Sequence, residues 1–232
     1  MLVTPLASVT EAARLASLRQ YDVLPFLREE VFDDFVSLAA RIFSLPICLF
    51  NLVDAQQVSP AAYHGLPAAT PQPRAEILCS TVVTHNRVVV YHDLSAAPQL
   101  ATDAVAIRAT LARGIHFYAA APVRLADAHS IGTLCLLDQQ PREFAAEEQH
   151  ILQALADTIS QAILTRYRCH TTPELGEAHW LHLRPKLHDE VHALAALVRY
   201  LLTRYGTLIP VPEEVLHLVW RRLADLRALL AE

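Results

Sequence analysis

The chain has 232 residues, enough for one sizeable hydrophobic core or for an ordinary domain with a small extension. Hydrophobic residues make up 53% of it, yet no apolar run approaches the roughly 18 residues that a transmembrane helix needs, so we expect no membrane partner. The net charge is −5, with no basic cluster beyond Arg221-Arg222, which argues against a nucleic-acid partner.

Two further features concern the cellular compartment. The first residues, MLVTPLASVT, lack the basic start and long apolar core of a secretory signal, which predicts a cytoplasmic protein. The four cysteines, at positions 48, 79, 135 and 169, form no CxxC pair, and three of them lie in apolar stretches. We therefore expect free thiols rather than disulfides or a zinc site.

The first predicted elements are two helices. Ser8-Val-Thr-Glu11 has the capping-box pattern, and the apolar spacing after it predicts an amphipathic helix that is followed by a turn at Pro25. Residues 29–43 carry a second apolar stripe with helical spacing, and Pro46 follows its end.

The next two segments are predicted strands. ICLFNLV, residues 47–53, is a nearly continuous apolar run, which is typical of a central strand covered on both faces. QQVSPAAYH, residues 56–64, returns beside it, and Pro60 restricts this strand to a sheet edge or a bulge. The proline-rich segment 65–74 is predicted to be a loop, and a short helix is predicted over 75–86.

RVVVYHD, residues 87–93, is rich in β-branched residues and predicts a third strand. A helix is predicted over 103–111. GIHFYAAAPVRL, residues 114–125, follows as a strand, and IGTLCLLD, residues 131–138, completes a hairpin with it. Alanine packs little and is a poor strand former, so the three central alanines leave room that either a ligand or a closely packed helix must fill.

The rest of the chain is predicted to be helical. Residues 144–168 repeat apolar side chains at helical spacing, and two further helices, 177–205 and 213–230, are joined by the loop GTLIPVP. The order of elements predicts an α+β fold: one antiparallel sheet covered by helices, followed by a C-terminal α-helical hairpin. We place the domain boundary between residues 1–170 and 171–232.

Six motifs occur in the order of a known family. They are EAARLASLRQYDVL, FDDFVSLAARIFSLPICLFNLVD, EILCSTVV, VVVYHDLSAAPQLA, GIHFYAAAPV and IGTLCLLDQQPREFAAEEQHILQALA. Through them the segment 11–168 resembles a GAF domain, of the bacterial subgroup found in sensor kinases and cyclase regulators. The resemblance implies a PAS-like sheet that forms the floor of a cavity roofed by helices and loops.

The resemblance also implies which side chains line that cavity. The expected ligand-binding residues are Tyr63, His64, Arg74, Cys79, Tyr91, Asp93, His116 and Tyr118. A histidine, an arginine and several tyrosines that converge on one pocket suit an anionic or planar polar ligand. Each of them could instead be a half-buried side chain with a satisfied hydrogen bond, and the sequence names neither a cofactor nor the ligand.

Several activities of the family are argued against by motifs that the sequence lacks. A covalent bilin is not expected, because the one Cys-His pair, Cys169-His170, follows the last helix of the GAF segment. We find no NKFDE-type signature of cyclic-nucleotide binding. Cys48 and Cys135 fall in strands that neighbour each other in a GAF sheet, but burial makes a thiol inert, so packing is favoured over a redox pair. A sulfoxide-reductase-type enzyme acting through Cys79 is a weaker alternative.

LHDEVHAL, residues 187–194, loosely resembles the phosphoacceptor box of histidine kinases, with His188 as the phosphoacceptor of a dimerising hairpin. His188 and His192 lie one helical turn apart, but no zincin base is in place, so we expect no metal site and no catalytic residue. The apolar face of the hairpin packs on a second copy of the chain or back on the GAF segment. We expect the first, a homodimer through residues 177–230.

Together these features predict a non-catalytic signal-transduction protein of a two-component type. Its GAF segment senses an unknown small molecule or a partner and is coupled to the dimerising hairpin. A histidine kinase or response regulator is the expected protein partner. The alternative is a phosphotransfer or kinase-accessory protein that accepts phosphate on His188.

Overall fold

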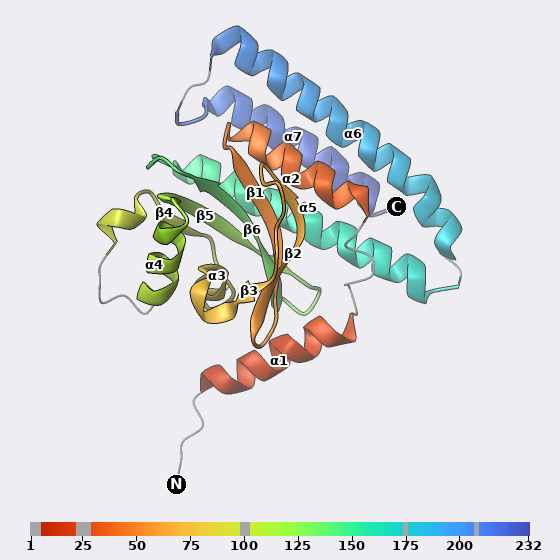
Figure 1. Cartoon of the computed structure of the whole chain (residues 1–232). Coiled ribbons are helices and arrows are strands. Elements are labelled where there is room, and N and C mark those ends of the chain that lie inside the picture. The colour runs from red at the N-terminus through yellow and green to blue at the C-terminus, as the bar shows by residue number, and fades with distance from the viewer. Residues whose placement is uncertain (1–5, 22–28, 98–102, 174–175, 207–208) are drawn as a thin grey trace.

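A six-stranded antiparallel sheet with helices on both faces forms the centre of the molecule (Figure 1). The computed structural model describes residues 6–21, 29–97, 103–173, 176–206 and 209–232, so the expected turn at Pro25 lies outside the described residues, as do two residues of the loop GTLIPVP. The strand order is β3-β2-β1-β6-β5-β4. The strands are β1 (Ile47–Val53), β2 (Gln57–His64), β3 (Gln72–Pro73), β4 (Val89–Tyr91), β5 (Phe117–Arg124) and β6 (Ser130–Asp138).

The helices confirm the predicted α+β class. They are α1 (Leu6–Gln20), α2 (Glu30–Ile42), α3 (Cys79–His85), α4 (Ala104–Ala112), α5 (Ala146–Thr171), α6 (Gly176–Tyr205) and α7 (Glu213–Leu230), with short 3-10 turns η2 (Arg74–Glu76) and η3 (Leu94–Ala96). Helices α2 and α5 cover one face of the sheet, and α3 and α4 lie over the other (Figure 1). Among the described helices, none combines the length and apolarity needed to span a bilayer.

The sheet separates two hydrophobic cores. In β1, Cys48, Phe50 and Leu52 enter the larger core beneath α2 and α5, whereas Ile47, Leu49 and Val53 enter the smaller core beneath α3 and α4. Successive side chains of a strand point to opposite faces, so a strand covered on both sides reads as a continuous apolar run. This confirms the prediction made from ICLFNLV.

The alanines of β5 are covered by helices. Ala119 and Ala121 lie in the larger core, where β5 packs against α5, and Ala120 lies in the smaller core with residues of α3. All three are fully buried. A side chain that ends at Cβ lets a helix approach the strand closely, so of the two explanations considered for this room, the closely packed helix is the one observed.

The C-terminal hairpin packs back on the rest of the chain. Its apolar side chains Trp180, Leu187, Val191 and Val219 are at most 1% exposed and belong to the larger core, because α6 contacts α2 and α7 contacts α5. This is the second of the two arrangements considered for the apolar face. The homodimer and the domain boundary at residue 170 stay predictions, and a dimer would use side chains outside this covered face, such as the exposed Tyr200 and Trp220.

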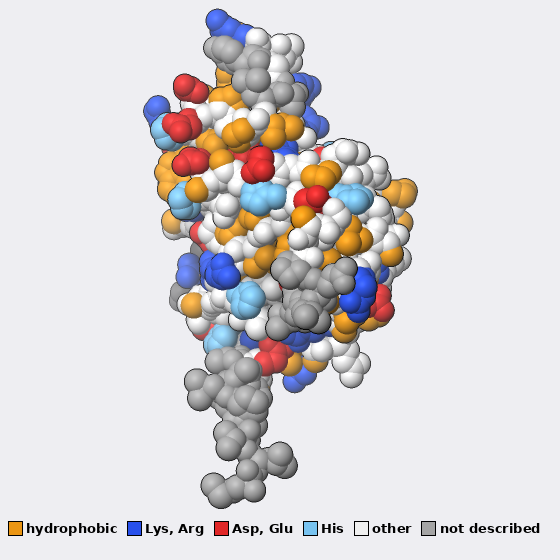
Figure 2. Space-filling view, turned by 90° about the vertical axis from the view of Figure 1, so that its left-hand side faces the viewer, with side chains coloured by type: hydrophobic (Ala, Val, Ile, Leu, Met, Phe, Trp, Pro, Cys, Tyr) orange, Lys and Arg blue, Asp and Glu red, His pale blue; other side chains and the backbone are white. Residues whose placement is uncertain are grey.

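The surface over α4 and β4 has mixed character. In Figure 2, which looks onto this side of the molecule, basic, acidic, histidine and apolar side chains alternate over the described residues of the face, and no single charge dominates.

A buried ion pair joins three parts of the chain. The Arg142 guanidinium donates to Glu148 Oε1 at 2.9 Å and to the carbonyl of Phe43 at the end of α2, and Glu148 is fully buried. The Glu148 carboxylate also accepts from the amides of Ala145 (2.8 Å), which precedes α5, and Val211 (3.2 Å), which precedes α7. Four donors therefore converge on one carboxylate and on the carbonyl beside it.

The change Glu148→Gln tests this ion pair. It leaves the charge of Arg142 buried without its counter-charge, and removing one partner of a buried pair costs about 3–5 kcal/mol of unfolding free energy. Denaturant unfolding measures the loss. The matched control is Glu147→Gln, one residue earlier and exposed, for which we expect a change within about 0.5 kcal/mol. Equal losses in the two variants would contradict the role assigned to Glu148.

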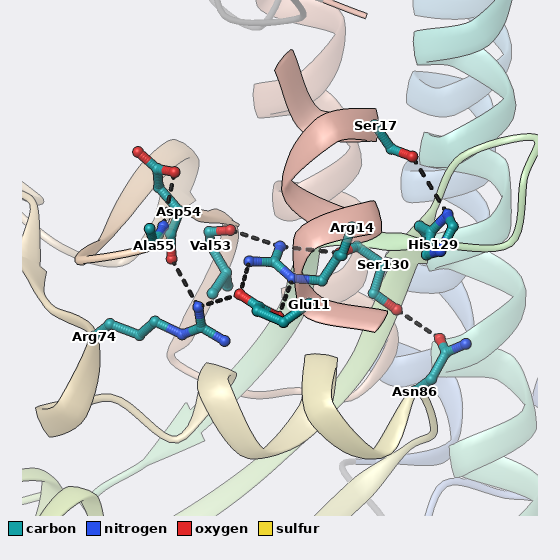
Figure 3. A network of polar contacts seen from close by, with 10 residues as sticks. All are labelled: Glu11, Arg14, Ser17, Val53, Asp54, Ala55, Arg74, Asn86, His129 and Ser130. Atoms are coloured by element: carbon teal, nitrogen blue, oxygen red, sulfur yellow. Dashed lines mark hydrogen bonds and ion pairs between the residues drawn. The ribbon is translucent and has the colours of Figure 1, made fainter. Parts of the chain in front are cut away.

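Helix α1 is held to the sheet by a network of polar contacts (Figure 3). Arg14 is 4% exposed and donates to Glu11 (2.8 Å) and to the backbone carbonyls of Val53 (2.7 Å) and Ser130 (3.2 Å). Arg74, which begins η2, donates to the same carboxylate of Glu11 and to the carbonyl of Asp54. Glu11 thus neutralises two guanidinium groups at the end of β1.

This network makes the attachment of α1 dependent on pH. The hydrogen bond from Arg14, together with the smaller effect of Arg74, lowers the pKa of Glu11 from 4.5 to about 2 against the opposing effect of burial. A carboxylate with a depressed pKa in the folded state stabilises the fold above its unfolded pKa and loses that contribution as the pH falls toward its folded pKa. We expect the stability difference between wild type and Glu11→Gln to be full at pH 7 and to shrink between pH 4.5 and pH 2.

Unfolding free energies measured across this pH range check the expectation. Glu147→Gln serves again as the control and should differ from wild type equally at all these pH values. A difference between wild type and Glu11→Gln that does not change with pH would contradict the network in Figure 3.

Candidate functional site

A cavity of about 270 Å³ lies over the smaller-core face of the sheet. Its floor is formed by Leu49 and Asn51 of β1, Tyr118 of β5, and Cys135 and Leu137 of β6. Its roof comes from the loop after β2, the start of α3 and the end of α4, with residues Leu66, Ala68, Ala69, Thr70, Ile77, Cys79, Thr110 and Arg113. The strands and helices thus place a few polar groups in an apolar chamber, as in many small-molecule sites.

A bulge in β2 shapes one wall of this cavity. Pro60 pairs with Asn51 and Ala62 pairs with Phe50, so one residue of β2 is left over between the two pairs. Before the bulge, Pro60 faces the cavity, and after it Ala62 lies in the larger core on the other face. Proline cannot donate a ladder hydrogen bond, which predicts a sheet edge or a bulge at Pro60, and the register confirms the bulge.

Two thiols meet where the roof of the cavity reaches its floor. Cys79 Sγ, from the first turn of α3, lies 3.4 Å from Cys135 Sγ on β6. The amide of Asn51 lies 3.6 Å from each sulfur, and the hydroxyl of Tyr118 lies 3.7 Å from Cys79 Sγ and 3.8 Å from Cys135 Sγ. Thr133 Oγ1 contacts Cys135 Sγ at 3.0 Å. Hydrogen-bond donors therefore surround a buried sulfur pair.

The surroundings shift the pKa values of the two thiols in opposite directions. The hydrogen bond from Cys135 lowers the pKa of Cys79, against the effect of burial, and Thr133, Tyr118 and Asn51 lower it further. Burial raises the pKa of Cys135, and its pairing with Cys79 raises it more. A thiolate is the nucleophilic form of cysteine, so the arrangement favours Cys79 as the reactive sulfur with Cys135 as its proton donor.

Two of the eight expected ligand-binding residues, Cys79 and Tyr118, line the cavity. His64 does not, because the bulge turns it to the α2 side, where its Nδ1 lies 3.2 Å from Ser37 Oγ. Tyr63 is 39% exposed and is not part of the lining. Arg74 lies outside the cavity as well, because Glu11 and the carbonyl of Asp54 hold it against α1.

The other three lie near β4 and the start of β5. Tyr91 donates its hydroxyl to Asp103, and burial together with this carboxylate raises the pKa of Tyr91. Asp93 accepts from the amide of Ser95 (2.9 Å) and from its hydroxyl (2.6 Å), and so caps η3. His116 is half-buried and pairs through its backbone with Leu94 and Asp138. None of the three belongs to the cavity lining.

The sequence analysis missed Asn51 and Arg113 as site residues. Asn51 could have been noticed, because an amide inside the apolar run ICLFNLV is out of place unless it serves a polar site. Cys48 and Cys135, which were weighed as a redox pair and expected to be packing residues instead, do not meet. Cys48 pairs with Leu136 in the ladder, so Cys48 and Cys135 point to opposite faces of the sheet, whereas Cys135 meets Cys79.

His188 lies far along the chain from the cavity lining, on α6. Its Nδ1 is 2.8 Å from Asp34 Oδ2 on α2, and its side chain is 47% exposed. Its role as a phosphoacceptor stays a prediction.

Comparison with known proteins finds one similar sequence and two similar solved structures. A cyclic di-GMP phosphodiesterase of Pseudomonas aeruginosa is 26% identical over 194 residues, which cover 82% of this chain and 31% of that protein. The GAF domain of a phosphoenolpyruvate-protein phosphotransferase from Acinetobacter has a TM-score of 0.47 and 17% identity, with 70% of this chain and 95% of that chain covered. A type II free methionine-R-sulfoxide reductase from Thermoplasma acidophilum has a TM-score of 0.49 and 16% identity, with 62% and 96% covered.

The name of the Pseudomonas aeruginosa protein corrects the expectation of a non-catalytic protein. That protein is named as a phosphodiesterase, and this chain spans about a third of its length. A relative with an enzymatic activity overturns the expectation, which rested on the absence of recognised catalytic motifs.

The family itself is shown by the sequence. The profile of the GAF domain matches residues 27–163, which run from just before α2 into α5 and so include the whole sheet and the cavity. The predicted resemblance is confirmed: this chain belongs to the GAF domain family.

Proposed function

We propose that the chain is the sensory region of a signalling protein, in which a small molecule binds in the cavity over β1, β5 and β6 and changes how α5, α6 and α7 pack. GAF membership supports a role in signalling or sensing. The observation that carries the finer proposal is the cavity itself, a chamber of about 270 Å³ lined in part by an amide, a phenol and two thiols.

The lining narrows the ligand class. Most of its side chains are apolar, and among the described lining residues Arg113 alone is positively charged. Its guanidinium is already engaged by Gln72 Oε1 (3.1 Å) and lies 3.5 Å from Glu76. The lining therefore suits a compact, largely apolar molecule with one polar group better than a strongly anionic ligand. The polar group of such a molecule would reach Asn51 and Tyr118.

A path for the signal crosses the sheet. Tyr118 lines the cavity, while its neighbours Phe117 and Ala119 lie in the larger core on the opposite face, where β5 packs against α5. Helix α5 is bonded to α7 by two side chains: Gln161 donates to the carbonyl of Arg227 (2.8 Å) and Thr165 to that of Leu230 (2.9 Å). A shift of β5 on ligand binding would reach α7 through these contacts.

The curated relative suggests the output. Because that protein is a cyclic di-GMP phosphodiesterase that this chain matches over 31% of its length, we propose that the sensed ligand modulates cyclic di-GMP turnover. The homodimer, and a histidine kinase or response regulator as the partner, remain predictions beside it.

Native mass spectrometry of the purified protein tests the cavity first. We expect added mass from a bound small molecule in the wild type. We expect that mass to be absent in Ala69→Phe, because a phenyl ring at the roof occupies space that the ligand needs. The control Ala55→Phe places the same ring in the exposed turn before β2 and should retain the ligand. The same spectra report the oligomeric state.

The outcome that contradicts the proposal is equally specific. Retention of the bound mass in Ala69→Phe would place the ligand elsewhere. A wild type that carries no ligand and gains none when incubated with a library of small metabolites would remove the sensing role.

The thiol pair favours a second candidate, reduction of a small sulfoxide. The sulfur of Cys79 would attack the sulfoxide sulfur, Cys135 would then form a disulfide with Cys79, and the products would be the sulfide and water. The two electrons come from the two thiols, and an external dithiol would regenerate them. The sulfurs are 3.4 Å apart, and both line the cavity.

The change Cys79→Ser tests this candidate. Sulfoxide reduction, followed as sulfide formed in the presence of dithiothreitol, should fall to background because the nucleophile is gone. Cys48→Ser is the control, since Cys48 lies in the other core and should keep the activity. Equal rates in the two variants, or no turnover in the wild type, would exclude the reductase function.

A further inference from the structure

Two helices that are far apart in the sequence share a cluster of three metal-ligating side chains. Asp34 lies on α2, in the GAF segment, and His188 and His192 lie one turn apart on α6. His188 Nδ1 is 2.8 Å from Asp34 Oδ2, and His192 Nε2 is 3.0 Å from Asp34 Oδ1. Both imidazoles thus direct a nitrogen at the same carboxylate, one on each oxygen.

These three groups have the chemistry and spacing of a metal site. Their ligand atoms all lie within 4.8 Å of one another. Imidazole nitrogen and carboxylate oxygen bind zinc at about 2.0–2.2 Å, and a tetrahedral ion with such bonds holds its ligand atoms about 3.4 Å apart. Side-chain rotations that move the ligand atoms by about an ångström would therefore bring all three onto one ion, with water as the fourth ligand.

We propose that Asp34, His188 and His192 bind a divalent first-row transition metal such as zinc, and that the ion clasps α6 of the C-terminal hairpin to α2 of the GAF domain. Two histidines four residues apart on a helix cover one side of an ion, and Asp34 supplies the ligand from the opposing helix. The described residues contain no other group of three or more such side chains that meets the same distance limit.

The local charge favours a cation. Glu30 and Asp33 precede Asp34 on α2, and Asp189 follows His188 on α6, while among the described residues that line the hollow Arg184 is the one arginine or lysine. A divalent ion at Asp34 would offset the repulsion among these carboxylates.

The site is open to an ion from solution. The side chains of His188 and His192 are 47% and 59% exposed, and that of Asp34 is 16% exposed. A hollow of about 220 Å³ beside them, lined in part by Pro185 and Val31, provides room for metal-bound water. The centroids of the two imidazole rings lie 4.1 Å apart, so both rings are close enough to share one ion.

The sequence predicts no metal at these histidines, because no zincin base stands beside them on the same helix. The third ligand comes instead from α2, 154 residues earlier than His188, and a spacing rule within one segment cannot find it.

Cobalt(II), a spectroscopic substitute for zinc, gives the sharpest test on the full chain. We expect one equivalent to bind with micromolar affinity and to give visible d–d bands without a thiolate charge-transfer band. Asp34→Asn, His188→Gln and His192→Gln should each weaken binding at least tenfold. The control variants His182→Gln and His217→Gln change exposed histidines of α6 and α7 and should bind as the wild type does.

A second readout ties the ion to the joining of the two helices. Zinc should raise the melting temperature of the wild type and of His182→Gln, and should leave that of His188→Gln unchanged, because a ligand that binds the folded state alone stabilises it. The same series in a Cys79→Ser background separates this site from the thiol pair.

Three results would overturn the proposal. They are a wild type that binds no cobalt at up to millimolar concentration, equal affinity in the ligand and control variants, and a spectrum dominated by thiolate charge transfer that disappears in Cys79→Ser. The last result would assign the metal to the cavity thiols instead.

Discussion

The buried carboxylate of Glu148 fixes where the helices sit on the sheet. It accepts from Arg142, from the amide of Ala145 just before its own helix and from the amide of Val211, while Arg142 also donates to the carbonyl of Phe43 just after α2. A charge with no exposure is tolerated only when its lone pairs are satisfied, so the positions of these segments are interdependent. The GAF domain and the two C-terminal helices consequently share one core, with Trp180 and Val219 in the same cluster as Phe32 and Phe50.

The second constraint is that the two faces of one sheet have different surroundings, a packed core on one side and a cavity on the other. The face beneath α2 and α5 is covered by packed side chains, because the alanines of β5 admit α5 and the rings of Phe117 and Phe144 pack with their centroids 5.7 Å apart. The opposite face keeps a chamber because its cover is a loop and two short helices. The space above β1 is therefore left by the cover rather than by the small residues of the floor.

The features that local chemistry determines could be read from the sequence. The bounds of β1 agree with the structure, since a strand buried on both faces must be apolar throughout, and Pro60 marks the bulge because it cannot donate a hydrogen bond. The features that depend on strand register could not be read from the sequence. A single extra residue in β2 moves His64 to the other face, and the ladder partner of Cys48 decides which cysteine Cys135 meets. Asp34 and its two histidines required the packing of α6 on α2.

Because the sheet separates the two cores, substitutions on its two faces have different effects as the sequence diverges in evolution. Side chains that line the chamber, such as Leu49, Leu137 and Ile77, contribute little to the packing of α5, α6 and α7. That packing depends on the larger core, on the opposite face of the sheet. Substitutions on the chamber side can therefore alter which molecule fits while the packing that carries the helices is retained. The alternation of side chains in β1 and β5 thus separates, residue by residue, the part of the sequence free to diverge in specificity from the part bound to preserve architecture.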